Sequence, residues 1–269
     1  MKTLKEQVDE LRKGGYRLPA AQMKVAHDVI LLAMHRCGFK KNSTVKGGVV
    51  MVRHMTGDIR RSTMDMDIAF VRRSISDASV ASFVKRINCI KGVRIAQFGT
   101  IEDLKHEDYH GKRVYLDVSD GSLAKPLRTK VDIGVHAHKE IAQVEYSFEL
   151  SNDSAPAELN ANSGEQIFAG KLLSLLRYGP VSRRPKDAFD MYYLRGRLDI
   201  TTFVRYVDIL IYRNPRCEAK NKRDVIDSLE RTFASRQYLR RLHDAKANWL
   251  QVEPERVTAS VVRFLRRVL

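Results

Sequence analysis

Two aspartates that lie two residues apart constrain the fold of this chain more than any other feature. Asp65 and Asp67 open a β-rich run over residues 65–70. Because residues i and i+2 of a β-strand point to the same face, both carboxylates project together, while Met66 and Ile68 enter the core. Two carboxylates on one face repel each other unless a cation lies between them. The run therefore predicts a strand that holds a divalent metal ion.

A glycine pair precedes this strand in the sequence. Gly47 and Gly48 follow Lys46, and glycine lets backbone N–H groups approach a phosphate closely. Mg²⁺ prefers one or two carboxylates together with phosphate oxygens. Taken alone, a Gly-Gly pair is more often a turn, and an Asp-x-Asp run is more often a solvated strand end. Together the two features indicate metal-dependent chemistry on a nucleoside triphosphate.

A third acid strengthens this interpretation. Asp132 lies inside the β-rich run 129–135, and its apolar neighbours on both sides disfavour a plain surface role. Asp117 competes for the same role. We favour Asp132, because Asp117 lies beside the turn-like sequence 119–121. Asp132 would then be placed to draw the proton from an acceptor hydroxyl.

The charge balance points to a polyanionic partner. The 269 residues include 48 Lys and Arg against 32 Asp and Glu, a formal net charge of +16. Such an excess is typical of proteins that bind nucleic acid, although it also serves solubility. Residues 157–269 carry 22 basic and 13 acidic side chains, hence +9, and arginine dominates there. Arginine suits phosphate because its planar fork bonds two oxygens.

The order of patterned segments predicts an α+β or α/β fold with two parts. Helices are expected at 3–13, 20–35, 49–54 and 77–90, and strands at 43–45, 65–70, 93–98, 113–118 and 130–135. After a loop-rich stretch at 151–164, helices are expected at 165–178, 186–196, 200–212, 220–232, 236–248 and 253–268. We therefore predict a domain with a mixed sheet over residues 1–156 and a helical bundle over residues 157–269.

The helical part opens with a second motif. Lys171 lies on a helical face from which its ammonium would reach triphosphate oxygens, and Lys186 at the start of the next helix would pair with phosphate. Asp187 and Asp190 are i, i+3 neighbours on that helix. The plainer alternative is that Asp187 complements the helix N-terminus and Lys171 is an ordinary exposed lysine.

The ordered set of motifs resembles the AbiEii/MenT nucleotidyltransferase toxins. The set comprises Lys46-Gly47-Gly48, Arg61-x-Thr63-x-Asp65-x-Asp67, Asp132, Lys171 and Lys186-Asp187-x-x-Asp190. The resemblance covers roughly residues 44–195, and beyond them the match is only one of helical, basic character. It implies a DNA polymerase β-like nucleotidyltransferase domain followed by a helical domain that completes the nucleotide site and offers a basic face to RNA.

The resemblance also implies a role for each motif residue. Asp65, Asp67 and Asp132 would hold Mg²⁺, or Mn²⁺ in its place, and act as catalytic residues. Lys171 would contact the triphosphate, and Asp187 would be the acid of the helical motif, with Asp190 a weaker candidate. The remaining nucleotide-binding residues would be Lys46, Gly47, Gly48, Arg61, Thr63 and Lys186.

The loop departs from many nucleotidyltransferases at one position. Those enzymes carry Gly-Ser, whereas Gly48 stands here in the serine's place, as it often does in the toxin-like subfamily. A loop hydroxyl for the γ-phosphate is therefore absent. Thr63 is predicted to supply a hydroxyl nearby.

The activity implied by the resemblance is an EC 2.7.7-type transfer of a nucleotide from an NTP to RNA, most often the tRNA 3′ end. The implied setting is a toxin–antitoxin or phage-defence system with a cognate antitoxin, often a winged-helix DNA-binding protein. Two alternatives stay open. One is transfer to a small molecule or a protein hydroxyl, and the other is a non-catalytic RNA-binding protein.

Apolar segments and cysteine spacing bear on where the protein resides and on the state of its thiols. No apolar run approaches the length of a membrane span and residues 1–6 lack a signal-peptide core, so a cytoplasmic protein without membrane contact is expected. Cys37, Cys89 and Cys217 are widely spaced and odd in number, which predicts reduced thiols, with Cys37 and Cys89 in the core.

Overall fold

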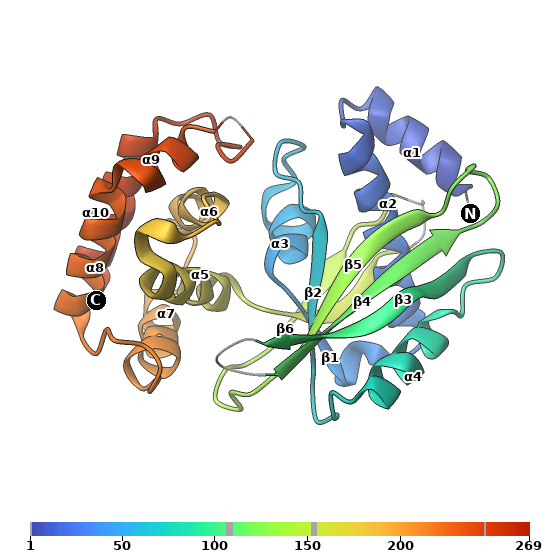
Figure 1. Cartoon of the computed structure of the whole chain (residues 1–269), viewed down its shortest axis with the longest axis horizontal. Helices are drawn as coiled ribbons and strands as arrows, with labels where there is room; N and C mark the ends of the chain where they lie inside the picture. The colour runs from blue at the N-terminus through green and yellow to red at the C-terminus, as the bar shows by residue number, and fades with distance from the viewer. Residues whose placement is uncertain (1, 106–109, 152–154, 245) are drawn as a thin grey trace. The chain divides into compact units, whose positions relative to one another are not determined.

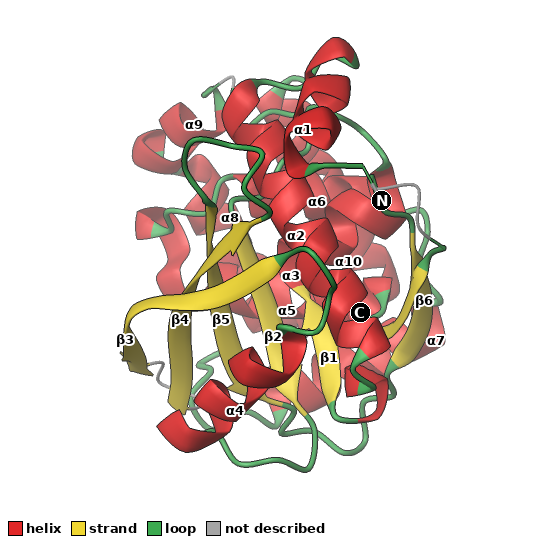
Figure 2. Ribbon diagram, turned by 90° about the vertical axis from the view of Figure 1, so that its right-hand side faces the viewer, coloured by secondary structure: helices red, strands yellow, loops and turns green. Residues whose placement is uncertain are grey.

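A computed structural model describes residues 2–105, 110–151, 155–244 and 246–269. The chain divides into two compact units, residues 1–162 and residues 163–269. Figures 1 and 2 show the sheet and its helices in the first unit and the all-helical second unit.

The first unit is built on one mixed sheet of seven strands in the order β3-β4-β5-β2-β1-β7-β6. The strands are β1 (Ser43–Lys46), β2 (Asp65–Phe70), β3 (Arg94–Lys105), β4 (His110–Ser119), β5 (Leu127–Val135), β6 (Val144–Phe148) and β7 (Ala157–Ala161). β2 runs parallel to β5 and antiparallel to β1, and β1 runs parallel to β7. The predicted mixed sheet is therefore confirmed.

Alternating burial along the strands gives the sheet one covered face. On β5, Thr129, Val131 and Ile133 are buried, whereas the residues between them are partly exposed. The imidazole Nε2 of His27, on helix α2 (Leu18–Arg36), lies 3.0 Å from the Thr129 hydroxyl, so the buried residues face α2. Lys130 and Asp132 consequently lie on the opposite face.

The remaining helices of this unit are α1 (Leu4–Lys13), α3 (Gly47–Val50) and α4 (Asp77–Ile87), with a short 3-10 helix at Phe39–Lys41. A π-helix, Met51–Thr56, continues directly from α3. A helix was predicted over residues 49–54, and its widened turn could not be read from the sequence. Helix α1 begins with a capping box, in which Thr3 and Glu6 satisfy each other's backbone N–H groups.

The last strand lies where a helical domain was expected to begin. Residues 157–161 form β7, which lies between β1 and β6 in the sheet. Burial alternates along this segment, as it does in a strand. Ala157, Leu159 and Ala161 are buried, and the Glu and Asn between them are half-buried. The first unit consequently extends to Asn162.

The second unit contains the helices α5 (Gly164–Tyr178), α6 (Lys186–Leu194), α7 (Ile200–Val207), α8 (Lys222–Ala234), α9 (Arg236–Leu242) and α10 (Pro254–Val268). A 3-10 helix at Gly179–Val181 follows α5, and a π-helix at Asp208–Tyr212 follows α7. Phe168, Phe203 and Phe264 pack together at the centre, with ring centroids 4.9 to 5.9 Å apart. A helix is thus present in each predicted C-terminal segment, but α9 ends at Leu242 rather than at residue 248, and the segment 200–212 is divided between α7 and the π-helix.

The prediction that Cys37 and Cys89 are reduced core residues is wrong. The two form a disulfide between the end of α2 and the segment after α4. Cys89 is exposed and Cys37 is half-buried, because each lies at the end of its helix rather than on the apolar face. Cys217 is a buried free thiol. In the described part of the chain, no helix combines the length and apolar character needed to cross a bilayer.

Candidate active site

The three predicted acids lie together on the open face of the sheet. Asp67 on β2 pairs in register with Asp132 on the parallel strand β5, and Asp65 lies two residues before Asp67. All three are partly exposed, whereas Met66 and Ile68 are buried as expected. Paired residues of neighbouring strands project to the same side, so one surface carries all three carboxylates. The rival Asp117 lies on β4 and is bound by Arg128, with 2.8 Å between Nε and Oδ1.

Two cations that sequence reasoning missed hold these acids. The Lys130 ammonium lies 2.9 Å from Asp65 Oδ1, from the position directly opposite on β5. The Arg113 guanidinium on β4 donates to both oxygens of Asp132, at 2.7 and 2.9 Å. This bidentate bond raises the pKa of Arg113. Sequence patterns could have indicated these two cations, because the strand alternation that pairs the acids also places a lysine and an arginine beside them.

The two glycines lie close to the acids and leave no room for side chains. Gly47 has φ +60°, and a Cβ added to it would lie 2.8 Å from Asp67 Oδ2. A Cβ on Gly48 would lie 2.5 Å from the Thr63 hydroxyl oxygen. That hydroxyl also donates to the backbone carbonyl of Asp65 at 3.2 Å. The Thr63 hydroxyl therefore fills the space that a serine at position 48 would need.

Lys46 and Arg61 flank this loop. Lys46 pairs with Asp67 across β1 and β2, and burial lowers the pKa of its ammonium while the Asp67 charge partly opposes that effect. Arg61 is only 5% exposed, and its guanidinium donates to the Ser62 carbonyl at 2.9 Å. Arg61 thus braces the segment that leads into β2.

A buried ion pair anchors the π-helix behind the glycine loop. Arg53 Nε lies 2.8 Å from Asp28 Oδ1, and the Asp28 side chain is fully buried on α2. Lys24 and the Ser151 backbone N–H and hydroxyl also bond Asp28. Burial alone would raise the pKa of Asp28, but the charges of Arg53 and Lys24 and the bonds from Ser151 lower it overall. The network is missed from sequence because its members are far apart in the chain.

In the second unit, Lys171 bridges both acids of the helical motif. Its ammonium lies 2.5 Å from Asp187 Oδ1 and 2.9 Å from Asp190 Oδ2, and its side chain is 12% exposed. Lys171 is therefore not an ordinary exposed lysine. Asp187 is bound by Lys171, and no side chain caps the start of α6 at Lys186, which is half-buried.

Asp190 serves the packing of the second unit. Its side chain is fully buried, and it accepts a hydrogen bond of 3.0 Å from the indole Nε1 of Trp249. Asp187 is more exposed and faces Tyr238, where burial first and then the Asp187 charge raise the pKa of the phenol. Of the two acids, Asp187 is thus the one nearer to solvent.

The donor set of the first unit fits a divalent cation chemically. Three carboxylates lie on one face, and oxygen donors are what Mg²⁺ and Mn²⁺ take. Among the described residues no three acids are gathered closely enough to hold an ion as they stand, so binding would require these side chains to move together. The absence of a Cβ at Gly47 keeps the space beside Asp67 open to backbone N–H groups. Asp65, Asp67 and Asp132 would hold the ion, and Lys130 would give up its contact with Asp65.

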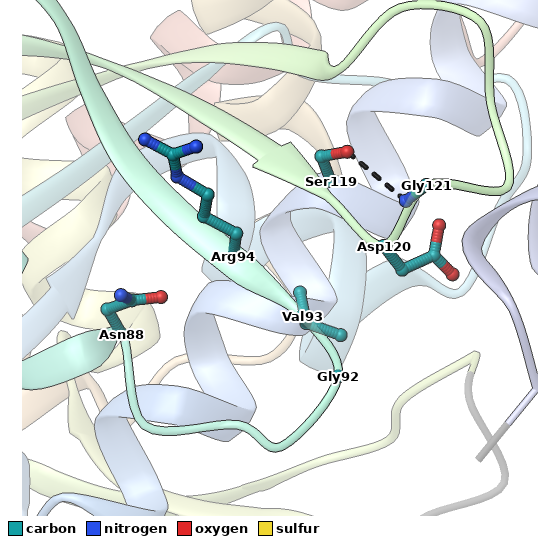
Figure 3. Close-up of a pocket in the computed structure, with 7 residues that line it drawn as sticks. All are labelled: Asn88, Gly92, Val93, Arg94, Ser119, Asp120 and Gly121. Atoms are coloured by element: carbon teal, nitrogen blue, oxygen red, sulfur yellow. Dashed lines mark hydrogen bonds between the residues drawn. The ribbon is translucent and has the colours of Figure 1, made fainter.

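A separate pocket of the first unit carries none of these residues (Figure 3). It lies between the end of α4 and the turn after β4, and its side chains include Asn88, Arg94 and Asp120. Asn88 accepts a hydrogen bond from the Ile95 backbone at 2.8 Å, and Asp120 accepts one from the Leu4 backbone at 2.7 Å. These polar groups therefore fix local structure.

Similar folds are found among solved structures. The nucleotidyltransferase toxin MenT4 from Mycobacterium tuberculosis aligns over 93% of this chain and 94% of its own, with a TM-score of 0.55 and 15% identity. JHP933 from Helicobacter pylori aligns over 94% and 95%, with a TM-score of 0.49 and 11% identity. At such identities the likeness to MenT4 shows a shared fold. Comparison with curated proteins gave no match.

The sequence itself matches a family model over most of its length. The model describes the nucleotidyl transferase AbiEii toxin of type IV toxin–antitoxin systems, and it matches residues 30–249. The match extends well past residue 195, so most of the helical second unit lies within the region that the family model describes. This protein therefore belongs to the AbiEii family of nucleotidyltransferase toxins and is a transferase of EC 2.7.7 type.

Proposed function

We propose that this protein transfers a nucleotide from an NTP to an RNA acceptor, the 3′ end of tRNA, in a Mg²⁺-dependent reaction. The observation that carries the proposal is the pairing of Asp67 with Asp132 in register, with Asp65 on the same face and the glycine loop against Asp67. This places carboxylates beside a backbone segment suited to phosphate.

The reaction needs one bond made and one broken. The 3′-hydroxyl oxygen of the acceptor attacks the α-phosphorus, the bond between the α-phosphorus and the bridging oxygen breaks, and pyrophosphate leaves. Asp132 takes the proton of the attacking hydroxyl, while the bidentate bond from Arg113 fixes the orientation of its carboxylate. When bound, Mg²⁺ supplies charge neutralisation at the phosphate oxygens.

The remaining predicted residues bind the triphosphate in this proposal. Gly47 and Gly48 offer backbone N–H groups, and Thr63 supplies the hydroxyl that a loop serine gives elsewhere. Lys171 and Lys186 in the second unit, with Lys46 and Arg61 in the first, stabilise negative charge that builds on the leaving pyrophosphate. Asp187 holds the Lys171 ammonium at 2.5 Å.

The net charge of +16 supports RNA rather than a small molecule as the acceptor. Membership of a toxin–antitoxin family implies an antitoxin. We propose that a cognate protein neutralises this chain, and that a winged-helix DNA-binding protein fits the role.

One transfer assay tests the proposal. Purified protein is incubated with each labelled NTP, Mg²⁺ and total cellular RNA, and the labelled product is sized. We expect label in RNA of tRNA size, and its loss in Asp67→Asn and Asp132→Asn. Asp9→Asn is the control, since it changes an exposed aspartate of α1. Label in a small molecule or protein would refute the RNA acceptor, and full activity in Asp67→Asn would refute the site.

A further inference from the structure

The open face of the sheet continues beyond the acids as a row of paired side chains. Asp65 on β2 lies opposite Lys130 on β5, which lies opposite Tyr115 on β4, which lies opposite Phe98 on β3. Figure 1 shows these four strands side by side, with β3 at the edge. Because paired residues project to the same side, the row leads from the proposed active site to the sheet edge.

Two aromatic rings lie on this row. Phe98 is 46% exposed, which is unusual for so large an apolar side chain, and Tyr115 is half-buried. The Arg128 guanidinium carbon lies 3.3 Å from the centroid of the Phe98 ring. Arginine planes and aromatic rings both stack on nucleobases. This surface thus exposes planar side chains that can stack on nucleobases.

The cation of the row, Lys130, and the two arginines beside the row are each paired with a carboxylate. Arg128 pairs with Asp117, Arg113 pairs with Asp132, and Lys130 pairs with Asp65. Net positive charge is therefore not what distinguishes this face. A duplex backbone is recognised mainly by uncompensated charge, whereas unpaired bases are recognised by stacking. The surface accordingly suits the unpaired end of a strand.

The chemistry fixes the side from which an acceptor arrives. In an in-line displacement, the attacking and leaving oxygens lie on opposite sides of the phosphorus. The glycine loop that would hold the leaving pyrophosphate lies on the β1 side of Asp67. The attacking hydroxyl must then come from the other side of the acids, where β4 and β3 lie.

We propose that Phe98 and Tyr115 form a stacking platform for the unpaired bases at the 3′ end of the RNA acceptor, with Arg128 covering the outer ring. The platform rests on the proposed nucleotidyl transfer and names the surface that presents the acceptor. It is sequence-tolerant, because every base has a stacking face.

Binding and crosslinking test the platform without catalysis. A short single-stranded RNA with a free 3′-hydroxyl is titrated against wild type, Phe98→Ala, Tyr115→Ala and the double variant, with fluorescence anisotropy as the readout. Each ring should contribute about tenfold in affinity. The Michaelis constant for NTP should stay unchanged while that for RNA rises. A 3′-terminal 4-thiouridine should crosslink to the peptides that carry Phe98 or Tyr115.

Two further variants test whether a loss of RNA affinity is specific to stacking at this edge of the sheet. Phe98→Tyr keeps a stacking ring and should retain wild-type affinity. Tyr146→Ala removes a half-buried ring from β6 at the opposite edge of the same sheet and should leave RNA affinity unchanged. Circular dichroism and the thermal midpoint verify folding, and Phe98→Gln or Tyr115→Gln replaces an alanine variant at the same position that does not fold.

The outcomes separate this inference from the proposed function. Unchanged RNA affinity in the double variant, an equal loss in Tyr146→Ala, or crosslinks confined to other peptides would overturn the platform. Wild-type protein that labels no RNA would instead overturn the proposed function. Loss of binding to a protein acceptor, with RNA affinity intact, would assign the surface to a protein partner and overturn the platform as well.

Discussion

At the scale of single residues, the hydroxyl of Thr63 and the missing side chain of Gly48 form a complementary pair. Gly48→Ser alone should place its Cβ 2.5 Å from that hydroxyl and raise the Michaelis constant for NTP at least tenfold. Thr63→Ala should also weaken NTP binding, because a hydroxyl is lost. The double variant removes the closest contact and restores a hydroxyl, but the Cβ at position 63 stays 2.9 Å from the added Cβ, so it should recover only part of the activity.

Steady-state kinetics of the four proteins give the coupling between these two positions directly. Additive losses in the double variant would show that the hydroxyl does not substitute for a loop serine.

The ion pair between Lys130 and Asp65 competes with metal for the same carboxylate. Lys130→Met should raise the affinity for Mn²⁺ about two- to fivefold, since a partly exposed pair of this kind contributes roughly 0.2–1 kcal/mol. Calorimetric titration of the nucleotide-free protein measures the change. Lys125→Met, on the exposed turn before β5, is the matched control. Weaker Mn²⁺ binding in Lys130→Met would mean that the lysine helps to organise the site.

Buried His27 predicts loss of stability in mild acid. Burial, with Arg53 as the next cause, lowers the pKa of His27 to about 3, below the roughly 6.5 of an unfolded histidine. Between these values the unfolded chain binds the extra proton, so stability falls as pH decreases. The loss from pH 6.5 to pH 5 should be about 2 kcal/mol. Urea unfolding measures it, and His27→Gln should flatten that slope.

At the scale of secondary-structure elements, the contact of α5 with α6 depends on one buried carboxylate. Asp190→Ala removes the contact of Asp190 with the Lys171 ammonium and the hydrogen-bond acceptor of the Trp249 indole. We expect a loss of about 3 kcal/mol in the free energy of unfolding, because removing one partner of a buried pair is costly. Asp227→Ala on the exposed face of α8 should cost under about 0.5 kcal/mol. Equal losses in the two variants would contradict a central role for Asp190.

Local patterns predicted the elements that carry the acids but not everything that surrounds them. Strand alternation placed Asp65 and Asp67 on one face, because that period is set by the backbone alone. The position of Asp132 beside Asp67 depends on the pairing of β2 with β5, which alternation within one strand does not give. Neither β6 nor β7 was predicted: β6 alternates apolar and polar residues but spans only five positions, and β7 contains Leu159 as its one large apolar residue, within a loop-rich stretch. The bond from Trp249 to Asp190 spans 59 residues and arises only from tertiary packing.

At the scale of the whole molecule, RNA binding should weaken steeply with salt. Arg213 and Arg223 have side chains that are 65% and 87% exposed, and Arg216 and Arg240 are also exposed. Four phosphate contacts give a slope of about −3 in log affinity against log salt, hence roughly a 60-fold loss from 50 to 200 mM. Anisotropy with tRNA measures it, and a flat response would contradict an arginine-rich RNA face.

Arg241 differs from these four arginines. Its guanidinium donates to the carbonyls of Pro180 and Ser182, at 3.2 and 2.6 Å. By sequence alone it would count with the other arginines of residues 157–269 as a phosphate contact. We expect Arg241→Gln to lower the thermal midpoint of unfolding by a few degrees and to leave the salt slope unchanged. A reduced slope would return Arg241 to the RNA-binding set.

The order of strands in the sheet has a consequence for the newly made chain. β1 lies between β2 and β7, and β2 lies between β1 and β5, so the strands that carry the acids and the glycine loop are central. Their neighbours β5 and β7 are synthesised much later than they are. A ribosome must therefore release residues up to about Ala161 before the central strands are paired on both sides. Translation thus delays the moment at which the sheet that carries the acids and the glycine loop is complete.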